Sequence, residues 1–192
     1  MNVLLLGPQG SGKGTQAKRI EAEYGIPHIA TGDMLRNAIA QETELGRQVK
    51  PILENGDLVP DELMIDLIQE RLEQPDTAEG FILDGFPRTA AQADALDNML
   101  SEIERELSIV FEFQLSDEVA RERLLRRAEL ENRTDDTPEA ITRRLDLYHE
   151  QTEPLIEHYR LQGNLVGVHG DRTVNEVFSE VQEALDQVAA RS

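Results

Sequence analysis

The sequence contains no cysteine, which excludes disulfides, thiolate zinc sites and cysteine nucleophiles together. It also has no apolar run close to the roughly 20 residues that a membrane-spanning helix needs. No basic stretch precedes an apolar one at the N-terminus, as it would in a targeting segment. We therefore expect a soluble, cytoplasmic protein with no membrane partner and no structural zinc.

Lysine is scarce, because only Lys13, Lys18 and Lys50 occur among 19 basic residues, against 38 acidic ones. The formal net charge is -19, and the averaged field of such a chain repels polyanions, so no nucleic acid partner is expected. Any phosphate ligand must meet a local cluster of positive charge. The acidic composition is typical of a solvated surface and predicts tolerance of high salt.

At 192 residues and 39% hydrophobic content, the chain is long enough for one well-packed domain. Short apolar runs alternate with longer helix-like segments. The runs are Asn2–Leu6, His28–Ala30, Phe81–Leu83, Ile109–Leu115 and Leu165–Val168. This alternation predicts an α/β fold, a five-stranded parallel sheet covered by helices on both faces in a three-layer α/β/α sandwich.

Two of the intervening segments carry the apolar stripes of core-facing helices. The first, residues 60–74, has a helix start signal at Pro60 and Asp61, and its stripe is Leu63, Leu67, Ile68 and Leu72. The second, residues 173–188, has the stripe Val174, Val177, Val181, Leu185 and Val188. We expect these side chains to lie in the core.

Two regions do not fit simple sheet-covering crossovers. About fifty residues, 31–80, separate the second and third predicted strands, which is enough for several helices and predicts a small lobe over the sheet edge. The other region, 126–136, reads RRAELENRTDD and is predicted to be a polar link between two helices.

A glycine-rich stretch, Gly7 to Lys13, matches the spacing GxxxxGK between a predicted strand and a helix. In that context backbone N–H groups converge on phosphate oxygens, the helix N-terminus adds partial positive charge, and the lysine reaches the phosphates. The alternative is a glycine-rich turn that merely closes a strand–helix unit. We favour the phosphate-binding interpretation.

Magnesium ligands are less obvious in this loop. The general pattern has Ser or Thr directly after the lysine, but Gly14 stands there and Thr15 follows, so no metal contact is predicted from the loop itself. Asp84, at the end of a predicted strand, is placed to hold Mg²⁺ through water, or alternatively to cap a helix or turn. Asp33 is a weaker candidate with an N-cap alternative, and His28 is interpreted as structural.

The loop sequence GPQGSGKGTQA resembles that of adenylate kinases and related nucleoside monophosphate kinases. Three further segments resemble the same family in the same order: TGDMLR (31–36), DGFPRTAAQ (84–92) and NRTDDTPEAITRRL (132–145). The resemblance implies a core of residues 1–30, 73–125 and 137–192, an AMP-binding lobe at 31–72 and a short lid at 126–136.

The resemblance also implies roles for individual residues. ATP would be bound by Gly10, Ser11, Gly12, Lys13, Gly14, Thr15, Arg123, Arg127 and Arg172. AMP would be bound by Thr31, Arg36, Val59, Gly85, Arg88, Gln92, Arg133 and Arg144, with Gln92 reading the adenine edge. The catalytic set would be Lys13, Arg88, Arg123, Arg133 and Arg144.

The arginines have simpler alternative interpretations. Arg36 and Arg88 could be ordinary surface residues. Arg123 could pair with Glu118 or Glu122, and Arg127 with Glu131, as helix-surface ion pairs. Arg123 and Arg127 are four residues apart, so on a helix both would project from one face.

No residue stands out as a general base, and a nucleotide phosphate needs none because it is already ionised at neutral pH. The resemblance therefore implies the reaction MgATP + AMP ⇌ 2 ADP, with Mg²⁺ as cofactor and a monomeric enzyme. A uridylate/cytidylate kinase of the same fold usually has Asn after GFPR, where this chain has Thr89. A GTPase switch is disfavoured because its NKxD pattern is missing. A non-catalytic nucleotide sensor is a further alternative that the sequence does not exclude.

Overall fold

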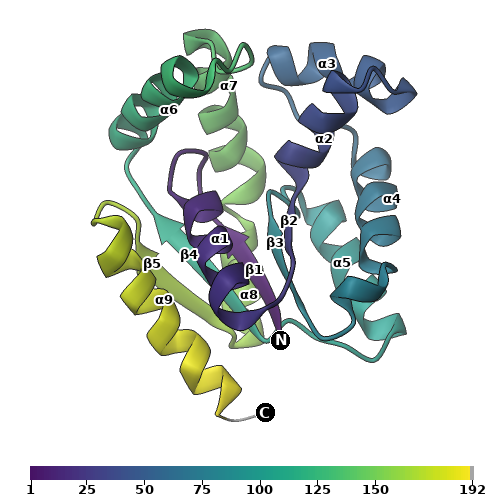
Figure 1. Cartoon of the computed structure of the whole chain (residues 1–192), viewed down its shortest axis with the longest axis vertical. Helices are drawn as coiled ribbons and strands as arrows, with labels where there is room; N and C mark the ends of the chain where they lie inside the picture. The colour runs from purple at the N-terminus through teal and green to yellow at the C-terminus, as the bar shows by residue number, and fades with distance from the viewer. Residues whose placement is uncertain (191–192) are drawn as a thin grey trace.

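Five parallel strands form one sheet in the computed structural model, which describes residues 1–190 (Figure 1). They are β1 (Asn2–Leu6), β2 (His28–Ala30), β3 (Phe81–Asp84), β4 (Ile109–Gln114) and β5 (Leu165–His169). Their order across the sheet is β2-β3-β1-β4-β5. All five predicted strands are confirmed, with ends that differ from the prediction by one residue at most.

The central strand β1 explains why the sequence begins with an unbroken apolar run. Its residues pair with β3 on one side and β4 on the other, so Leu4 lies opposite both Leu83 and Val110. Every residue of β1 is buried. A strand covered on both faces gains from apolar side chains at every position, rather than at alternate ones.

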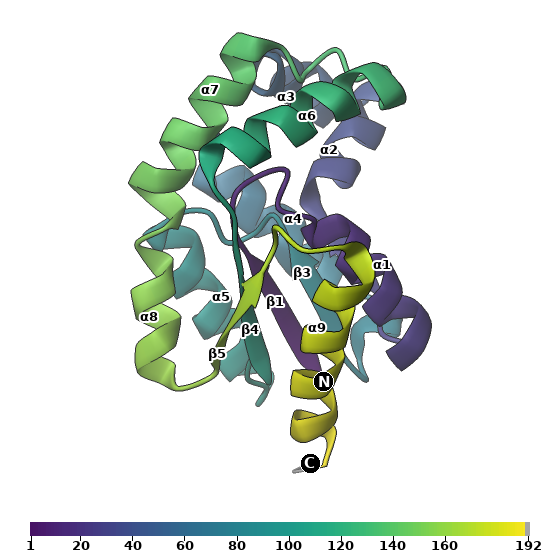
Figure 2. The same ribbon diagram turned by 90° about the vertical axis from the view of Figure 1, so that its left-hand side faces the viewer.

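Helices cover both faces of the sheet, as the three-layer prediction requires (Figure 2). On one face, α1 (Lys13–Tyr24) and α9 (Val174–Ala189) pack over Val3 and Leu5. On the other, α4 (Asp61–Leu72), α5 (Ala90–Glu102) and α8 (Leu155–Gln162) pack over Leu4 and Leu6. Each fully buried leucine stabilises the fold by roughly 1.5–3 kcal/mol.

The predicted stripe of α4 is partly wrong. The helix begins at Asp61 after Pro60, as expected, but its fully buried residues are Met64, Ile68 and Leu72. Leu63 and Leu67 are only half-buried at the flank of the core. Both sets have helical spacing, and the packing partners decided which set faces inward.

The predicted stripe of α9 is right at its centre and wrong at its ends. Val177, Val181 and Leu185 are buried together with Phe178, which the prediction omitted. Val174 is 49% exposed because it lies in the first turn, at the rim of the cavity described below. Val188 is only half-buried, near the other end of the helix.

Most of residues 31–72 are helical. They form α2 (Thr31–Ala40), α3 (Glu44–Glu54) and α4, followed by a 3₁₀ turn, η1 (Pro75–Thr77). Gly46, in the first turn of α3, packs against the end of α2, and a Cβ atom there would lie 2.1 Å from the carbonyl oxygen of Ala38. Only glycine allows these two helices to approach so closely.

The predicted link at 126–136 is not a continuous loop. α6 (Asp117–Glu131) runs through its first half and ends at Asn132, whose φ of 50° is left-handed. Arg, Ala, Glu and Leu in residues 126–131 are strong helix formers, which explains the extension. The chain continues into α7 (Pro138–Leu147) and a π-helical turn, η2 (Tyr148–Thr152).

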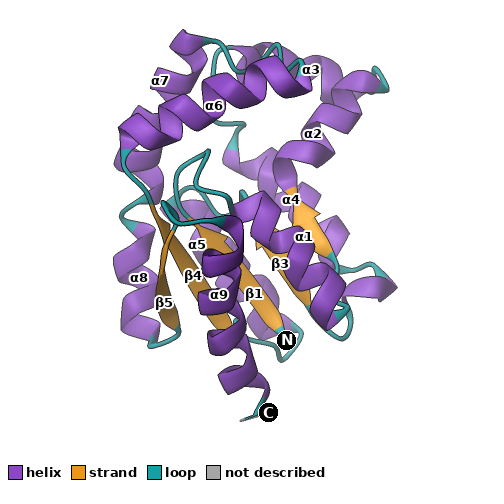
Figure 3. Ribbon diagram, turned by 60° about the vertical axis from the view of Figure 1, so that its left-hand side comes forward, coloured by secondary structure: helices purple, strands orange, loops and turns teal. Residues whose placement is uncertain are grey.

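α6 and α7 form a small packing unit of their own, built on Ala120, Leu124, Ile141 and Leu145. With α2 and α3, this unit arches over the carboxyl ends of the strands (Figure 3). Within residues 1–190, no helix combines the length and apolar character needed to cross a bilayer.

Candidate nucleotide-binding site

The glycine-rich loop lies at the carboxyl end of the central strand. Because β3 and β4 flank β1 on opposite sides, the loop lies where the sheet's connections change direction, the usual ligand site of such sheets. Gly12, with φ of 94°, precedes α1, which starts at Lys13. A Cβ atom on Gly7 would lie 2.7 Å from the carbonyl oxygen of Phe113, so the close packing of loop and sheet requires glycine.

A single cavity of about 840 Å³ opens above this loop. Its walls come from the loop, α2, the start of α4, α6, α7 and the segment before α9. Every residue predicted for the ATP, AMP and magnesium sites lines it. The fold therefore brings together segments that are far apart in the sequence, while the individual roles of these residues stay predictions.

Lys13 lies at the base of the cavity. Its Nζ donates hydrogen bonds to the carbonyl oxygens of Gly7 and Pro8, each at 2.8 Å. Burial lowers the pKa of Lys13 to about 8, although the neighbouring Asp84 opposes the change. A half-buried ammonium beside an amide-lined loop has the position and charge to bind a phosphate.

Asp84 lies next to Lys13, at the end of β3. Burial by itself would raise the pKa of Asp84, but the facing His28 and Lys13 outweigh burial, so the net pKa is lowered and the carboxylate stays ionised. The Asp84 carboxylate faces the side chains of His28 and Lys13. It does not cap the nearby helix α5, whose N-cap is Thr89. An ionised carboxylate on the cavity wall suits Mg²⁺, which keeps several waters and takes one or two carboxylates besides substrate phosphates.

His28, which we interpreted as structural, faces a carboxylate at the end of the neighbouring strand. Its Nε2 lies 3.4 Å from Asp84 Oδ2, and its side chain is only 7% exposed. The pairing arises because β2 runs parallel beside β3. The sequence interpretation missed this contact, since nothing local to residue 28 shows which carboxylate it will meet.

The segment after β3 places Arg88 in the wall of the cavity. Its Nε donates to the carbonyl oxygen of Gly85 at 2.7 Å. Burial lowers the pKa of Arg88 to about 10, which leaves the guanidinium charged at neutral pH. Thr31 lies nearby and donates from Oγ1 to the carbonyl oxygen of Asp84 at 3.2 Å.

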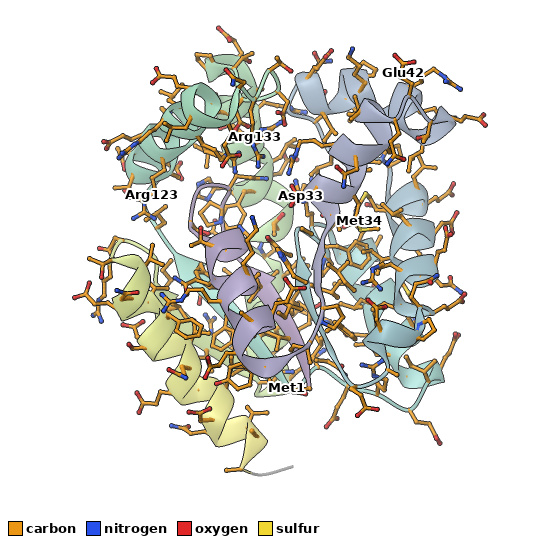
Figure 4. All side chains as sticks on the ribbon, viewed as in Figure 1. Met1, Asp33, Met34, Glu42, Arg123 and Arg133 are labelled. Atoms are coloured by element: carbon orange, nitrogen blue, oxygen red, sulfur yellow. The ribbon has the colours of Figure 1, made fainter. Side chains whose placement is uncertain are left out.

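Asp33 does not cap α2, so that alternative is wrong. The N-cap residue is Ala30, and Asp33 instead pairs with Arg36 at 2.6 Å. Asp33 on α2 and Arg133 beyond α6, both labelled in Figure 4, line the same cavity. Burial alone would raise the pKa of Asp33. The hydrogen bond from Arg36 and the charges of Arg36, Arg133 and Lys18 outweigh burial, so the net pKa is lowered.

The arginines of α6 and α7 are held by a pair of carboxylates. Asp136 is buried and accepts from Nε of Arg127 at 2.9 Å and from Arg144. Arg144 also pairs with Asp135 at 3.0 Å. The alternative partner of Arg127, Glu131, instead pairs with Arg133 at 2.6 Å. The Asp-Asp doublet after Arg133 was the available sequence signal for this cluster.

The other end of the cavity lies between α6 and the loop before α9. Arg123 donates to the carbonyl oxygen of Gly170 at 2.7 Å. This hydrogen bond, rather than an ion pair with Glu118 or Glu122, positions the Arg123 side chain. Arg172 pairs with Glu180. Thr173 caps α9 in a reciprocal hydrogen-bonding arrangement with Glu176.

A third group of residues lies beyond Arg88. Gln92 is buried, its Nε2 donates to Asp61 Oδ1 at 2.8 Å, and its Oε1 accepts from the Arg88 backbone N–H at 2.8 Å. Val59, also buried, lines the same part of the cavity.

A glycine-rich loop at the topological switch of a parallel sheet, facing a cationic cavity, defines the class of P-loop nucleotide-binding proteins. Sequence comparison narrows this class. The model of the family "Adenylate kinase" matches residues 5–164. The chain belongs to the adenylate kinase family.

The similarity to known adenylate kinases extends over nearly the whole chain. An adenylate kinase of Cyanothece sp. is 48% identical over 186 residues, covering 97% of this chain and 95% of that protein. One of Thermus thermophilus is 49% identical over 183 residues, covering 95% and 96%. An adenylate kinase of Archaeoglobus fulgidus is 42% identical over an alignment of 215 residues, which covers 98% of this chain and 99% of that protein.

Proposed function

We propose that the chain is a phosphotransferase that catalyses the reversible reaction MgATP + AMP ⇌ 2 ADP and so maintains adenine nucleotide balance. The observation that carries this proposal is that one cavity holds both a phosphate-binding loop with Lys13 and an opposing set of arginines. Such a cavity suits two polyanions bound side by side rather than one.

The chemistry requires positioning and charge neutralisation more than proton transfer. The acceptor phosphate of a nucleotide is already ionised, so no general base is needed. Cationic groups fixed around the transferred phosphoryl group stabilise the charge that moves to the leaving oxygen, and they act most strongly once water is excluded. The half-buried Lys13 and Arg88 provide such groups.

We assign the donor to the loop end of the cavity and the acceptor to the end near α2 and α4. The donor phosphates would contact residues 10–15, Arg123, Arg127 and Arg172. The acceptor would contact Thr31, Arg36, Val59, Gly85, Arg88 and Gln92. Arg133 and Arg144 would bind between the two nucleotides, with Lys13 and Arg88, where the phosphoryl group passes.

Magnesium would arrive with ATP. Bound there, Mg²⁺ supplies charge neutralisation of the phosphate oxygens. Asp84 would hold it through water. Among residues 1–190, no group of three or more His, Asp or Glu side chains is placed to hold a metal ion. We propose that nucleotide phosphates and waters coordinate Mg²⁺ and that Asp84 accepts hydrogen bonds from those waters.

Residues 31–72 and 126–136 would close over the bound nucleotides. Asp136 pairs with Arg127 and Asp135 pairs with Arg144, and nucleotide phosphates would compete for the same guanidinium groups. We further propose a cytoplasmic monomer with neither nucleic acid nor membrane as partner. The net charge of -19 supports the proposal about partners, because it repels both nucleic acid and an anionic membrane surface.

The experiment is a coupled assay of the purified chain with MgATP and each of AMP, CMP, UMP and GMP. We expect a strong preference for AMP. Lys13→Ala and Arg88→Ala should each lower kcat/KM by about 100-fold or more, in the range typical of a lost transition-state donor. Lys50→Ala and Arg160→Ala, which change exposed residues outside the cavity, are the matched controls and should retain activity.

Circular dichroism must show that the Lys13 and Arg88 variants remain folded. Faster turnover of CMP or UMP than of AMP would replace the proposal with a uridylate/cytidylate kinase. Binding of nucleotides without turnover would replace it with a nucleotide sensor.

A further inference from the structure

A polar network joins the start of α4 to the start of α5 behind the part of the cavity that we assign to the acceptor base. Its centre is Gln92, which is 2% exposed. The Gln92 Nε2 atom lies 2.8 Å from Asp61 Oδ1, and its Oε1 atom lies 2.8 Å from the Arg88 backbone nitrogen. Both ends of the amide are therefore engaged by the protein.

The chemistry of these partners permits only one orientation of the amide. A carboxylate only accepts hydrogen bonds, so the Gln92 nitrogen must face Asp61. A backbone N–H only donates, so the Gln92 oxygen must face Arg88. A flipped amide would place two acceptors together at Asp61 and two donors together at Arg88, each a buried unpaired contact.

Thr89 strengthens the acceptor role of Asp61. The Thr89 hydroxyl oxygen accepts from the backbone N–H of Gln92 as the cap of α5, at 3.3 Å. Its proton is therefore free for Asp61 Oδ1, 2.9 Å away. Asp61 thus receives two donors on one oxygen, and both come from residues at the start of α5.

Each end of the Gln92 amide keeps one unused position, because an amide nitrogen has two protons and an amide oxygen has two lone pairs. Adenine offers an acceptor at N1 and a donor at its 6-amino group. Hypoxanthine has nearly the same shape but offers a donor at N1 and an acceptor at O6. An amide held in one orientation can match only one of these patterns at a given base position, whereas a freely turning amide can match both.

We propose that Asp61 is a positioning residue that sets acceptor specificity by holding the Gln92 amide in the orientation that accepts adenine and rejects 6-oxopurines. This inference rests on the proposed function, since it assumes that the acceptor base lies against Gln92. Asp61 itself need not touch the nucleotide.

The test compares AMP with IMP, whose base is hypoxanthine, so that donor and acceptor order is the main difference. For the wild type, Asp61→Asn and Asp61→Ala, kcat/KM is measured for each acceptor at saturating MgATP. The dissociation constants of AMP and IMP are measured by calorimetry without ATP. We expect the AMP:IMP ratio of kcat/KM to fall about tenfold in Asp61→Ala, which corresponds to about 1.4 kcal/mol.

Asp61→Asn should reduce the ratio less than Asp61→Ala, because the side-chain oxygen of Asn can still accept a hydrogen bond from Gln92 Nε2, whereas Ala offers no acceptor. In both variants the change should lie mainly in KM for the acceptor, with kcat for AMP little altered, a split that general loosening of the fold would not produce. Asp66→Asn removes an exposed charge from the same helix and should leave the ratio unchanged. Thr89→Ser keeps the hydroxyl and should also preserve it.

An AMP:IMP ratio that stays within twofold of the wild-type value in both Asp61 variants would overturn the inference, even if total activity falls. So would a wild-type chain that binds and uses IMP as well as AMP, a result that needs no variant and is independent of folding. Failure of the wild type to phosphorylate any monophosphate would instead overturn the proposed function.

Discussion

The half-buried amine of Lys13 illustrates how single side chains in this cavity are held by the protein's own groups. Two carbonyl oxygens of its own loop accept its protons, and burial lowers its pKa to about 8. The charged and neutral forms therefore exchange near physiological pH. A bound phosphate would favour the charged form, because an opposite charge nearby raises the pKa of a lysine.

This balance predicts a pH dependence of ATP binding. Since the ammonium form binds phosphate, kcat/KM for ATP should be level below about pH 7 and should fall as pH rises through about 8. The kcat at saturating ATP should fall only at higher pH, because bound phosphate raises the pKa of Lys13. Rates measured from pH 6 to 10 in the wild type provide the test.

The Lys50→Ala variant, which changes an exposed lysine, should give the same profile as the wild type. A value of kcat/KM for ATP that stays constant to pH 10 would contradict this account of Lys13.

At the scale of elements, the α6–α7 pair depends on a small cluster of its own and on good helix ends. α7 begins after Thr137, whose side chain accepts a hydrogen bond from the backbone N–H of Ala140 at 3.1 Å, and Pro138 occupies the first turn. The same helix carries Arg144. A stable start of α7 therefore helps to hold the cationic wall of the cavity.

Removing this cap should weaken the pair. We expect Thr137→Ala to lower the free energy of unfolding by about 1 kcal/mol and Tm by about 2–4 °C for a domain of this size. Thermal unfolding followed by circular dichroism measures the effect, and amide exchange should show it concentrated in α6 and α7.

Thr137→Ser keeps the accepting oxygen and serves as the control, with Tm close to the wild-type value. Equal losses in the Ala and Ser variants would show that the hydrogen bond of the cap contributes little.

Over the whole molecule, negative charge dominates while the cavity gathers positive charge. The net charge is -19, yet the wall of the cavity includes Lys13, Arg36, Arg88, Arg123, Arg127, Arg133, Arg144 and Arg172. The field far from the cavity repels anions, and the local cluster attracts them. Self-repulsion of the acidic surface destabilises the folded state at low ionic strength.

We therefore expect salt to stabilise this protein. At 1 M KCl the screening length is about 3 Å, so repulsion between surface carboxylates is weakened, Tm should rise, and turnover at saturating nucleotides should persist. Tm and turnover measured from 0.05 to 1 M KCl provide the test. Collapse of activity in molar KCl would contradict this prediction.

Much of the fold was predictable because its signals are local. Apolar runs marked all five strands, and the spacing of Gly7, Gly12 and Lys13 marked the phosphate loop. Helix faces were less predictable. In α4, Leu63 and Met64 are both apolar, and helical periodicity alone does not say which of them faces the core. The end of α6 was misplaced because the polar, charged composition of residues 126–131 was interpreted as a loop, despite its strong helix formers.

Amino-acid sequence alone determined the strands, the loop and the identity of the side chains around the cavity, because spacing and composition act over a few residues. Only the tertiary structure decided which side chains meet: His28 with Asp84 across two parallel strands, Asp61 with Gln92 between two helices, and Arg127 and Arg144 on one buried Asp136. The physical reason is that these contacts depend on strand order and helix packing, which join residues far apart in the chain.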